Sequence, residues 1–248
     1  MLLTCRADSS DFEENVTEQH CVPDYDAPTS LSPEKVEGMV YNRRAHNEPN
    51  NFNSAAEQFL RAFTPVFNRT RDDPGSEQYL LANMLMIRYL IARINLSRSP
   101  SESELSTDVF LRDFMLAVSL SREIISHAKT TVHKTLFDFD VGLGTSVFVL
   151  ARVCREPRVR REAIQLLSEL GVRRGGWFDK RSATGIARWL MEREEDGMNG
   201  CFVPDEARLR LIRHEVVGKR MARVMCSKFV WREGKATREM MEPVLITL

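Results

Sequence analysis

Apolar residues recur at intervals of three and four through most of the chain, in segments separated by short polar, proline or glycine breaks. This spacing places the apolar side chains of a segment on one face of an α-helix. Six such segments follow one another, around residues 55–63, 80–94, 111–125, 139–153, 157–170 and 183–191. The pattern therefore predicts a mainly α fold, either an irregular multi-helix bundle or a scaffold of stacked helix pairs.

Two prolines mark expected helix boundaries. Pro65 comes close to the end of the first apolar pattern, which predicts that the first helix stops there. Pro157 suits the first turn of the fifth segment, because a helix leaves its first N–H groups unpaired in any case. Gly171 follows that segment, where a terminating left-handed residue is favoured.

The most apolar segment is interrupted by polar residues. Asn83, Arg88 and Arg93 fall within the pattern at 80–94. A helix that spans a membrane needs about 20 largely apolar residues in a row. We therefore expect this segment to be a helix buried in protein.

The pattern changes near the carboxyl end. Leu209 and Leu211 alternate with Arg208 and Arg210, and a second apolar stretch, 221–229, follows Gly218. Alternation of this kind on either side of a glycine is typical of a β-hairpin. The sequence predicts a small hairpin here, with a helix as the alternative.

Charge divides the chain into three parts. Residues 1–40 hold nine acids and two bases, whereas residues 206–238 hold ten bases and three acids, although the whole chain is neutral. We predict an acidic, Pro/Ser-rich and largely disordered arm over 1–50, a helical regulatory domain over 51–205, and a basic segment over 206–248 that packs on it. Solvation, or attraction between the two ends, explains the basic segment more simply than nucleic-acid binding.

Residues with catalytic or metal-binding chemistry do not form a recognisable motif. The five cysteines include no C-x2-C pair, which indicates reduced, intracellular thiols, and the five histidines include no H-E-x-x-H. Asp138 and Asp140 are interpreted as caps of the helix that follows them. Gly142 and Gly144 lack the third glycine of a dinucleotide-binding loop, and no serine stands in G-x-S-x-G. The sequence predicts no catalytic, cofactor or metal site.

The densest basic region combines seven arginines with a nearby Trp177. Nucleic-acid contacts are one interpretation of this composition. Because Glu156, Glu162 and Glu169 accompany the arginines, a solvated helix face with ion pairs is the preferred prediction. The arginines are Arg152, Arg155, Arg158, Arg160, Arg161, Arg173 and Arg174.

Three strings of residues, at 137–144, 149–167 and 173–179, occur in an order that resembles the carboxy-terminal half of fungal zinc-cluster transcription factors. In that family a step of cysteine, basic residue, acid and proline opens a helix that ends in leucines, here Cys154–Pro157. A loop of basic residues, glycine, tryptophan and aspartate follows, here 173–179. The helix at 183–195 and the string 203–211 continue in the same order, and the resemblance extends over about residues 55–235.

The resemblance implies a regulatory protein without the zinc cluster. Family members bind DNA through six cysteines that hold two zinc ions, and this sequence has neither six cysteines nor their spacing. We expect a protein of the nucleus or cytoplasm that contacts transcription machinery or a related factor. Control of a secondary-metabolite gene cluster is the role that the resemblance suggests.

Other interpretations remain open at this stage. One is a small-molecule-binding or biosynthetic pathway protein with a pocket between helices near Phe148, Trp177 and Trp189. A gene model truncated at its 5′ end and a paralogue that has lost its role are two more.

Overall fold

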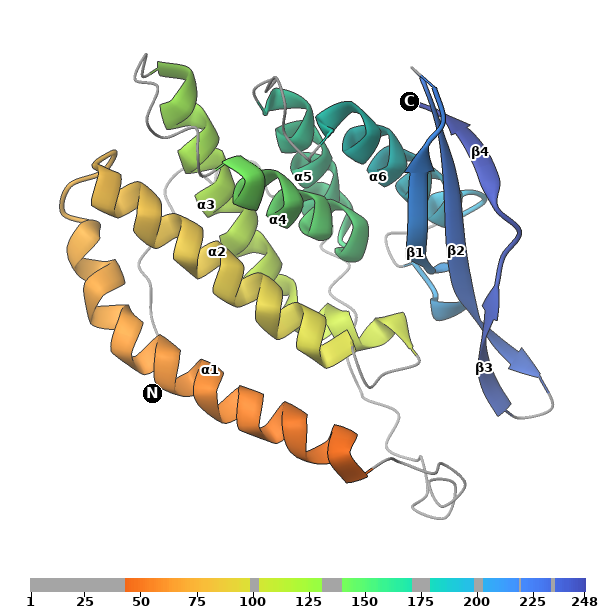
Figure 1. Cartoon of the computed structure of the whole chain (residues 1–248), viewed down its shortest axis with the longest axis horizontal. Helices are drawn as coiled ribbons and strands as arrows, with labels where there is room; N and C mark the ends of the chain where they lie inside the picture. The colour runs from red at the N-terminus through yellow and green to blue at the C-terminus, as the bar shows by residue number, and fades with distance from the viewer. Residues whose placement is uncertain are drawn as a thin grey trace, which may run out of the picture. The chain divides into compact units, whose positions relative to one another are not determined.

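Six helices come first in the described chain and a four-stranded sheet follows (Figure 1). The computed structural model describes residues 43–98, 103–130, 140–170, 179–198, 203–218, 220–232 and 235–248. They belong to one compact unit, 41–248, and the predicted disordered arm lies almost wholly outside them.

The helices are α1 Arg43–Thr70, α2 Glu77–Arg98, α3 Leu111–Thr130, α4 Asp140–Val153, α5 Pro157–Glu169 and α6 Lys180–Glu195. The strands are β1 Leu209–Val216, β2 Met221–Arg232, β3 Lys235–Met240 and β4 Val244–Thr247. The predicted mainly α class with a C-terminal β-hairpin is confirmed, and the hairpin belongs to a larger sheet.

The first helix is longer than the sequence predicts. It begins at Arg43 and continues through Pro65 to Thr70. A proline removes the N–H that would pair with the carbonyl of Arg61, but Arg61 is exposed and water can serve that oxygen. Phe63 and Phe67, one turn apart on either side of the proline, are both buried in the helical core. Their packing against α2 offsets the lost hydrogen bond, so the helix does not stop at Pro65.

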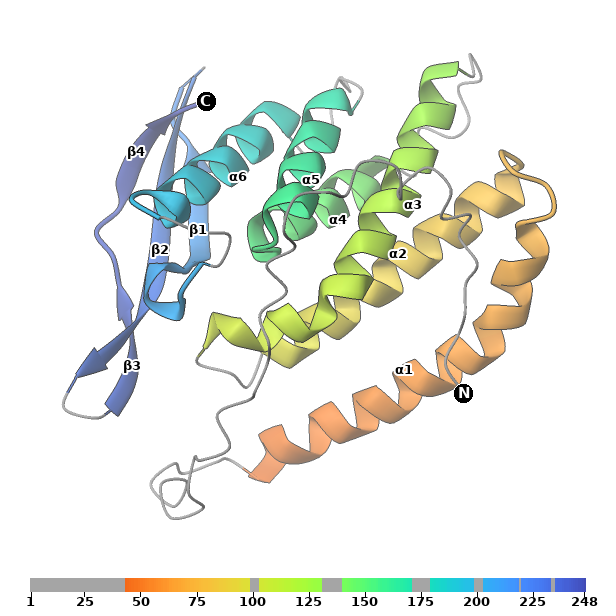
Figure 2. The same cartoon turned by 180° about the vertical axis from the view of Figure 1, so that it is seen from behind.

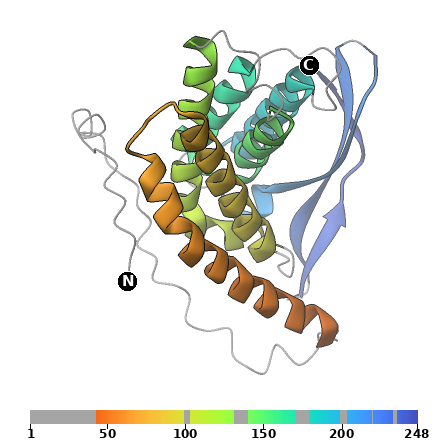
Figure 3. The same cartoon turned by 60° about the vertical axis from the view of Figure 1, so that its left-hand side comes forward.

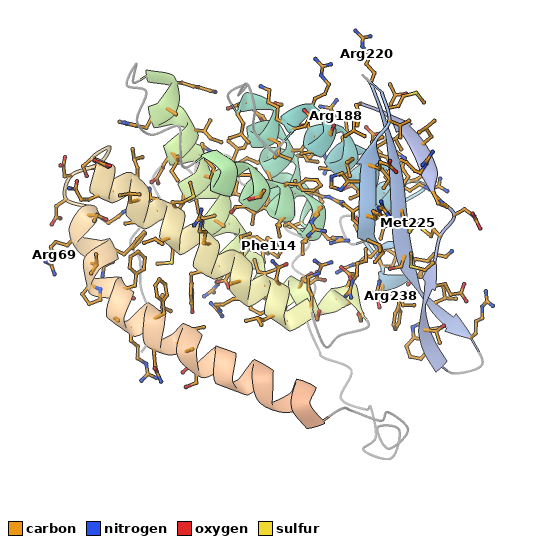
Figure 4. All side chains as sticks on the ribbon, viewed as in Figure 1. Arg69, Phe114, Arg188, Arg220, Met225 and Arg238 are labelled. Carbon is orange, nitrogen blue, oxygen red and sulfur yellow. The ribbon has the colours of Figure 1, made fainter. Side chains whose placement is uncertain are left out.

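The apolar helix α2 is buried in the helical core, as predicted. Within the described ranges it is the helix whose length and composition would allow it to cross a membrane. Two of its polar residues have partners on α3: the amide of buried Asn83 donates to Glu123 at 3.1 Å, and Arg93 pairs with Asp113 at 3.1 Å. Asn83 and Arg93 thus tie α2 to α3, whose Phe114 lies in the same core (Figure 4).

Helix α6 packs on two partners at once. Ala183 and Ala187 belong to the core that the other helices form. Ile186 and Leu190, on the next part of the helix surface, belong to a second core with residues of the sheet. The sheet residues of this second core are Leu209, Ala222, Val224, Cys226 and Ile246. One helix therefore joins the helical layer to the sheet (Figure 2).

Strand β2 is the centre of the sheet. It pairs antiparallel with β1 on one side and with β3 and β4 on the other. Gly218, at the turn between β1 and β2, has a φ of 77°, a conformation that glycine adopts without strain. The pairing register shifts at Ile212, between Leu211 and Arg213, which marks an irregularity in the edge strand β1.

Strand β2 buries opposite faces along its length. In its first half the buried residues are Ala222, Val224 and Cys226, which face α6. In its second half they are Ser227 and Phe229, which point to the other face. The 3₁₀ helix η5 Asp205–Ala207 contacts β2. Arg238 of β3 approaches both Ser227 and Glu104, the first residue of the 3₁₀ helix η3 Glu104–Phe110. The helices lie mainly to one side of the sheet in Figure 3.

The joint between α6 and the sheet leads to a first prediction. Ile186 is fully buried, so Ile186→Ala is expected to lower the free energy of unfolding by about 2–5 kcal/mol. Ile212 is 49% exposed, and Ile212→Ala is expected to change it by about 0.5 kcal/mol or less. Urea unfolding of the two variants measures both values. Equal effects would contradict the assignment of α6 as the joint.

Candidate functional site

The step Cys154–Pro157 joins α4 to α5, and its side chains have structural roles. Glu156 caps α5: its carboxylate accepts a hydrogen bond from the Val159 N–H at 2.6 Å, and Pro157 occupies the first turn. Cys154 is buried, and burial raises the pKa of its thiol to about 12. A thiol in this state is a poor nucleophile near neutral pH. The string that resembles zinc-cluster factors is here a helix boundary.

The second residue of the step, Arg155, makes a buried bidentate ion pair with Glu194. Its Nη2 lies 2.7 Å from Glu194 Oε1, and its Nε lies 3.1 Å from Glu194 Oε2. Arg160 approaches the same carboxylate, with 2.7 Å between Nη1 and Oε2. All three side chains are buried, and the arginines hold the pKa of Glu194 below its usual range although burial alone would raise it. One carboxylate from α6 thus holds two guanidinium groups from the α4–α5 region.

The ion pair extends to the main chain of the sheet. The N–H of Leu209 donates to Glu194 at 2.6 Å, and Arg155 donates to the carbonyl of Leu209 at 2.9 Å. Leu209 is the first residue of the edge strand β1. These bonds pair the N–H and carbonyl of Leu209 on the side where β1 has no neighbouring strand. They attach the start of β1 to α6 and to the end of α4.

A second buried carboxylate, Glu104, lies at the start of η3. Arg98 at the end of α2 lies 2.9 Å from it, Arg155 lies 4.0 Å away and Arg238 lies 3.3 Å away. Arg210 donates to it through Nε. Burial alone would raise the pKa of Glu104, but Arg98, Arg155 and Arg210 outweigh that effect and lower it to about 2. Arg238 lies on β3 and is labelled in Figure 4.

A third pair fastens η3 to the loop that precedes the sheet. Both terminal nitrogens of Arg208 lie 2.7 Å from oxygens of Asp108, and its Nε donates to the carbonyl of Val203 at 2.8 Å. Asp205 accepts from the N–H of Glu104 at 3.1 Å. We call the whole set the arginine junction. Its members are Arg98, Glu104, Asp108, Arg155, Arg160, Glu194, Arg208, Arg210 and Arg238.

The chemistry of the arginine junction favours a structural role. Glu104 and Glu194 have lowered pKa values, so near neutral pH neither holds a proton to donate. Their arginine partners stay protonated and cannot accept one. A general acid or base needs a pKa near the working pH, which neither carboxylate has. The junction holds η3, α6 and the sheet together and offers no route for proton transfer.

The prediction of a solvated arginine face is wrong for two residues. Arg155 and Arg160 are buried in the junction, because their carboxylate partner lies on α6, far away in the sequence. Arg158 is exposed, and Arg161 forms a surface pair with Glu195 at 2.5 Å, as expected for such a face. Arg173, Arg174 and Trp177 lie outside the described residues. A local sequence pattern could not have separated the buried arginines from the exposed ones.

The remaining residues considered from the sequence are dispersed. His127 lies in the last turn of α3 and His214 on β1, whereas His20, His133 and Asp138 lie outside the described part of the chain. Gly142 and Gly144 are inside α4 rather than in a phosphate loop. Phe148 and Trp189 both pack against the second core beside the sheet. Among the described residues, groups of three His, Cys, Asp or Glu side chains placed to hold a metal ion are absent.

Comparison with known proteins does not identify a family, since no family model, curated protein or solved structure matches the chain. The role of the arginine junction is therefore inferred from its geometry alone.

Adjacent acids on α6 test the junction. Glu194→Gln leaves Arg155 and Arg160 buried without a counter-charge, and is expected to cost about 3–5 kcal/mol of the free energy of unfolding. Glu195→Gln removes a pair with the half-exposed Arg161, and is expected to cost about 1 kcal/mol or less. Chemical denaturation measures both variants. Similar losses would show that burial of the pair is not what matters.

The pKa of Glu104 predicts how stability depends on pH. A carboxyl whose pKa is lowered on folding stabilises the fold above its unfolded pKa, near 4.5, and this contribution is lost as the pH falls toward about 2. The lost contribution amounts to about 3 kcal/mol. The stability difference between the wild type and Glu104→Gln should therefore shrink between pH 5 and pH 2, measured by urea unfolding at each pH. A difference that stays constant over this range would refute the lowered pKa.

Proposed function

We propose that this protein regulates transcription through contacts with other proteins, in the manner of the regulatory half of zinc-cluster factors. The observation that carries the proposal is an exposed apolar and basic surface on the sheet. The resemblance in sequence supports the same role, and the described residues that carry it most strongly lie in α4, α5, α6 and the start of β1.

This surface, the outer sheet face, lies opposite α6. Met221, Arg223 and Met225 alternate along β2 with the buried residues that face α6, so their side chains point outward. The register places Leu245 of β4 beside Arg223, and Leu245 is 51% exposed. Arg213 of β1 lies beside Met225, which Figure 4 labels on the sheet. Methionine and arginine are both enriched in protein interfaces.

Charge on the sheet indicates the kind of partner. Arg213, Arg220 and Arg223 are exposed, and Glu215 forms a half-exposed pair with Arg223 at 3.5 Å. Three other bases of the segment 206–248 pair with acids of the arginine junction instead, namely Arg208, Arg210 and Arg238. The outer sheet face is thus apolar with a positive rim. A partner with acidic and apolar side chains complements it.

A tethering assay tests the proposal. The full chain is fused to an unrelated DNA-binding domain, and transcription of a reporter gene is measured in fungal cells. We expect reporter output to change severalfold with the wild type, and Leu245→Lys to abolish the change by placing a charge in the apolar interface. Val66→Lys on α1 is the matched control, because Val66 is 48% exposed and lies on a helix away from the sheet.

Two outcomes count against the proposal. One is a reporter that does not respond, with the fusion shown to be folded by circular dichroism. The other is tight, sequence-selective binding of the purified chain to a library of promoter DNA, which would replace protein contacts by direct DNA recognition.

A further inference from the structure

Strand β1 has an open edge beyond its first residues. It pairs with β2 on one side, and no other described strand lies on its second side. On that second side the arginine junction takes up the N–H and carbonyl of Leu209. The last five residues of the strand, from Ile212 to Val216, are all exposed. An exposed strand edge with unpaired main-chain groups can accept a further strand.

The direction of the main-chain groups shows which residues this edge offers. The N–H of Val217 donates to the carbonyl of Met221, so the polar groups of Val217 point toward β2. In an antiparallel pair these groups alternate in direction along the strand, and therefore His214 and Val216 point theirs away from β2. The register shift at Ile212 ends this regular stretch. The open edge thus includes His214 and Val216.

The charges on either side of His214 have opposite signs. Arg213 and Glu215 lie on the outer sheet face, beside Met225 and Arg223 in the register with β2. The pair of Glu215 with Arg223, at 3.5 Å, is half-exposed, and such a pair contributes little by itself. An antiparallel strand of the same sequence, placed with His214 opposite its own copy, sets Arg213 of each strand opposite Glu215 of the other.

The charges also select this register over its neighbours. With a two-fold axis at His214, the two His214 residues exchange main-chain hydrogen bonds, and Arg213 and Glu215 form non-hydrogen-bonded pairs, whose side chains are closest. An axis at Arg213 or at Glu215 would instead set like charges directly opposite each other, which is destabilising. The selected register also sets Val216 opposite Ile212, whose apolar side chains are 47% and 49% exposed.

The other edge of the sheet is interrupted. It is divided between β3 and β4, which pair with different parts of β2 and are separated by residues 241–243. The continuous open stretch with self-complementary charges is therefore on β1.

We propose that two copies of this chain pair through their β1 edges, antiparallel about a two-fold axis at His214, and form one continuous sheet. Each copy gives the same residues to the contact, as a two-fold interface requires. Burial and the charge of Arg152 lower the pKa of His214, so the facing imidazoles are neutral at pH 7 and do not repel each other. The two outer sheet faces then lie next to each other, but the dimer does not depend on the partner proposed for them.

Sedimentation velocity of the purified full chain tests the pairing. We expect the wild type to dimerise over a concentration series up to about 100 μM, because an interface of one strand pair is small. Arg213→Glu and Glu215→Arg each set like charges opposite each other twice in the dimer, and each should weaken it about tenfold or more. Both side chains are exposed, so both variants should fold, which circular dichroism checks.

A mixture of the two variants separates this register from a general effect of charge. In a dimer with one copy of each variant, opposite charges face each other again at both pairs. The mixture should therefore dimerise with about the wild-type affinity, at concentrations where neither variant does so alone. Arg69→Glu, a charge reversal at an exposed arginine of α1 labelled in Figure 4, should leave the dimer unchanged. A monomeric wild type, single variants that dimerise as the wild type does, or a mixture that stays monomeric overturns the proposal.

Discussion

The buried carboxylate of Glu194 is the interaction on which the described fold depends. It pairs with Arg155 and Arg160 and accepts the N–H of Leu209, so it connects α6, the α4–α5 boundary and the first strand. Removing three charges from water costs several kcal/mol for each ion, and the pairing returns that cost only while every partner is present. The junction therefore makes the arrangement of helices and sheet all-or-none, rather than adding greatly to net stability.

Glu104 is a second buried carboxylate that joins elements through arginines, here on the other face of the sheet. It lies in a 3₁₀ helix and is approached by arginines of α2, β1 and β3. Strand β2 packs on α6 and on η5, and its buried residues change face at Cys226 and Ser227. A sheet held on both faces keeps its remaining outer surface in a fixed shape. Such preorganisation lowers the cost of binding a partner.

The arginine junction and the neighbouring Arg152 differ in how their charges are compensated. Glu194 and Glu104 are shared among arginines that surround them, and those arginines lower the pKa of both carboxyl groups. Burial and the charges of Arg98 and Arg155 lower the pKa of Arg152, a few residues away, and its buried Nε has no hydrogen-bond acceptor.

Local patterns of side chains were sufficient for most helices and for the first hairpin. The segments at 80–94, 157–170 and 183–191 became α2, α5 and α6, because their apolar spacing is a property of neighbouring residues. The passage of α1 through Pro65 depended on the burial of Phe67, and β3 and β4 depended on pairing with β2. Arg155 and Glu194 are 39 residues apart, and Arg210 and Glu104 are 106 apart. Whether an arginine is buried, exposed or left without a counter-charge is set by contacts across such separations, which periodicity along the chain does not encode.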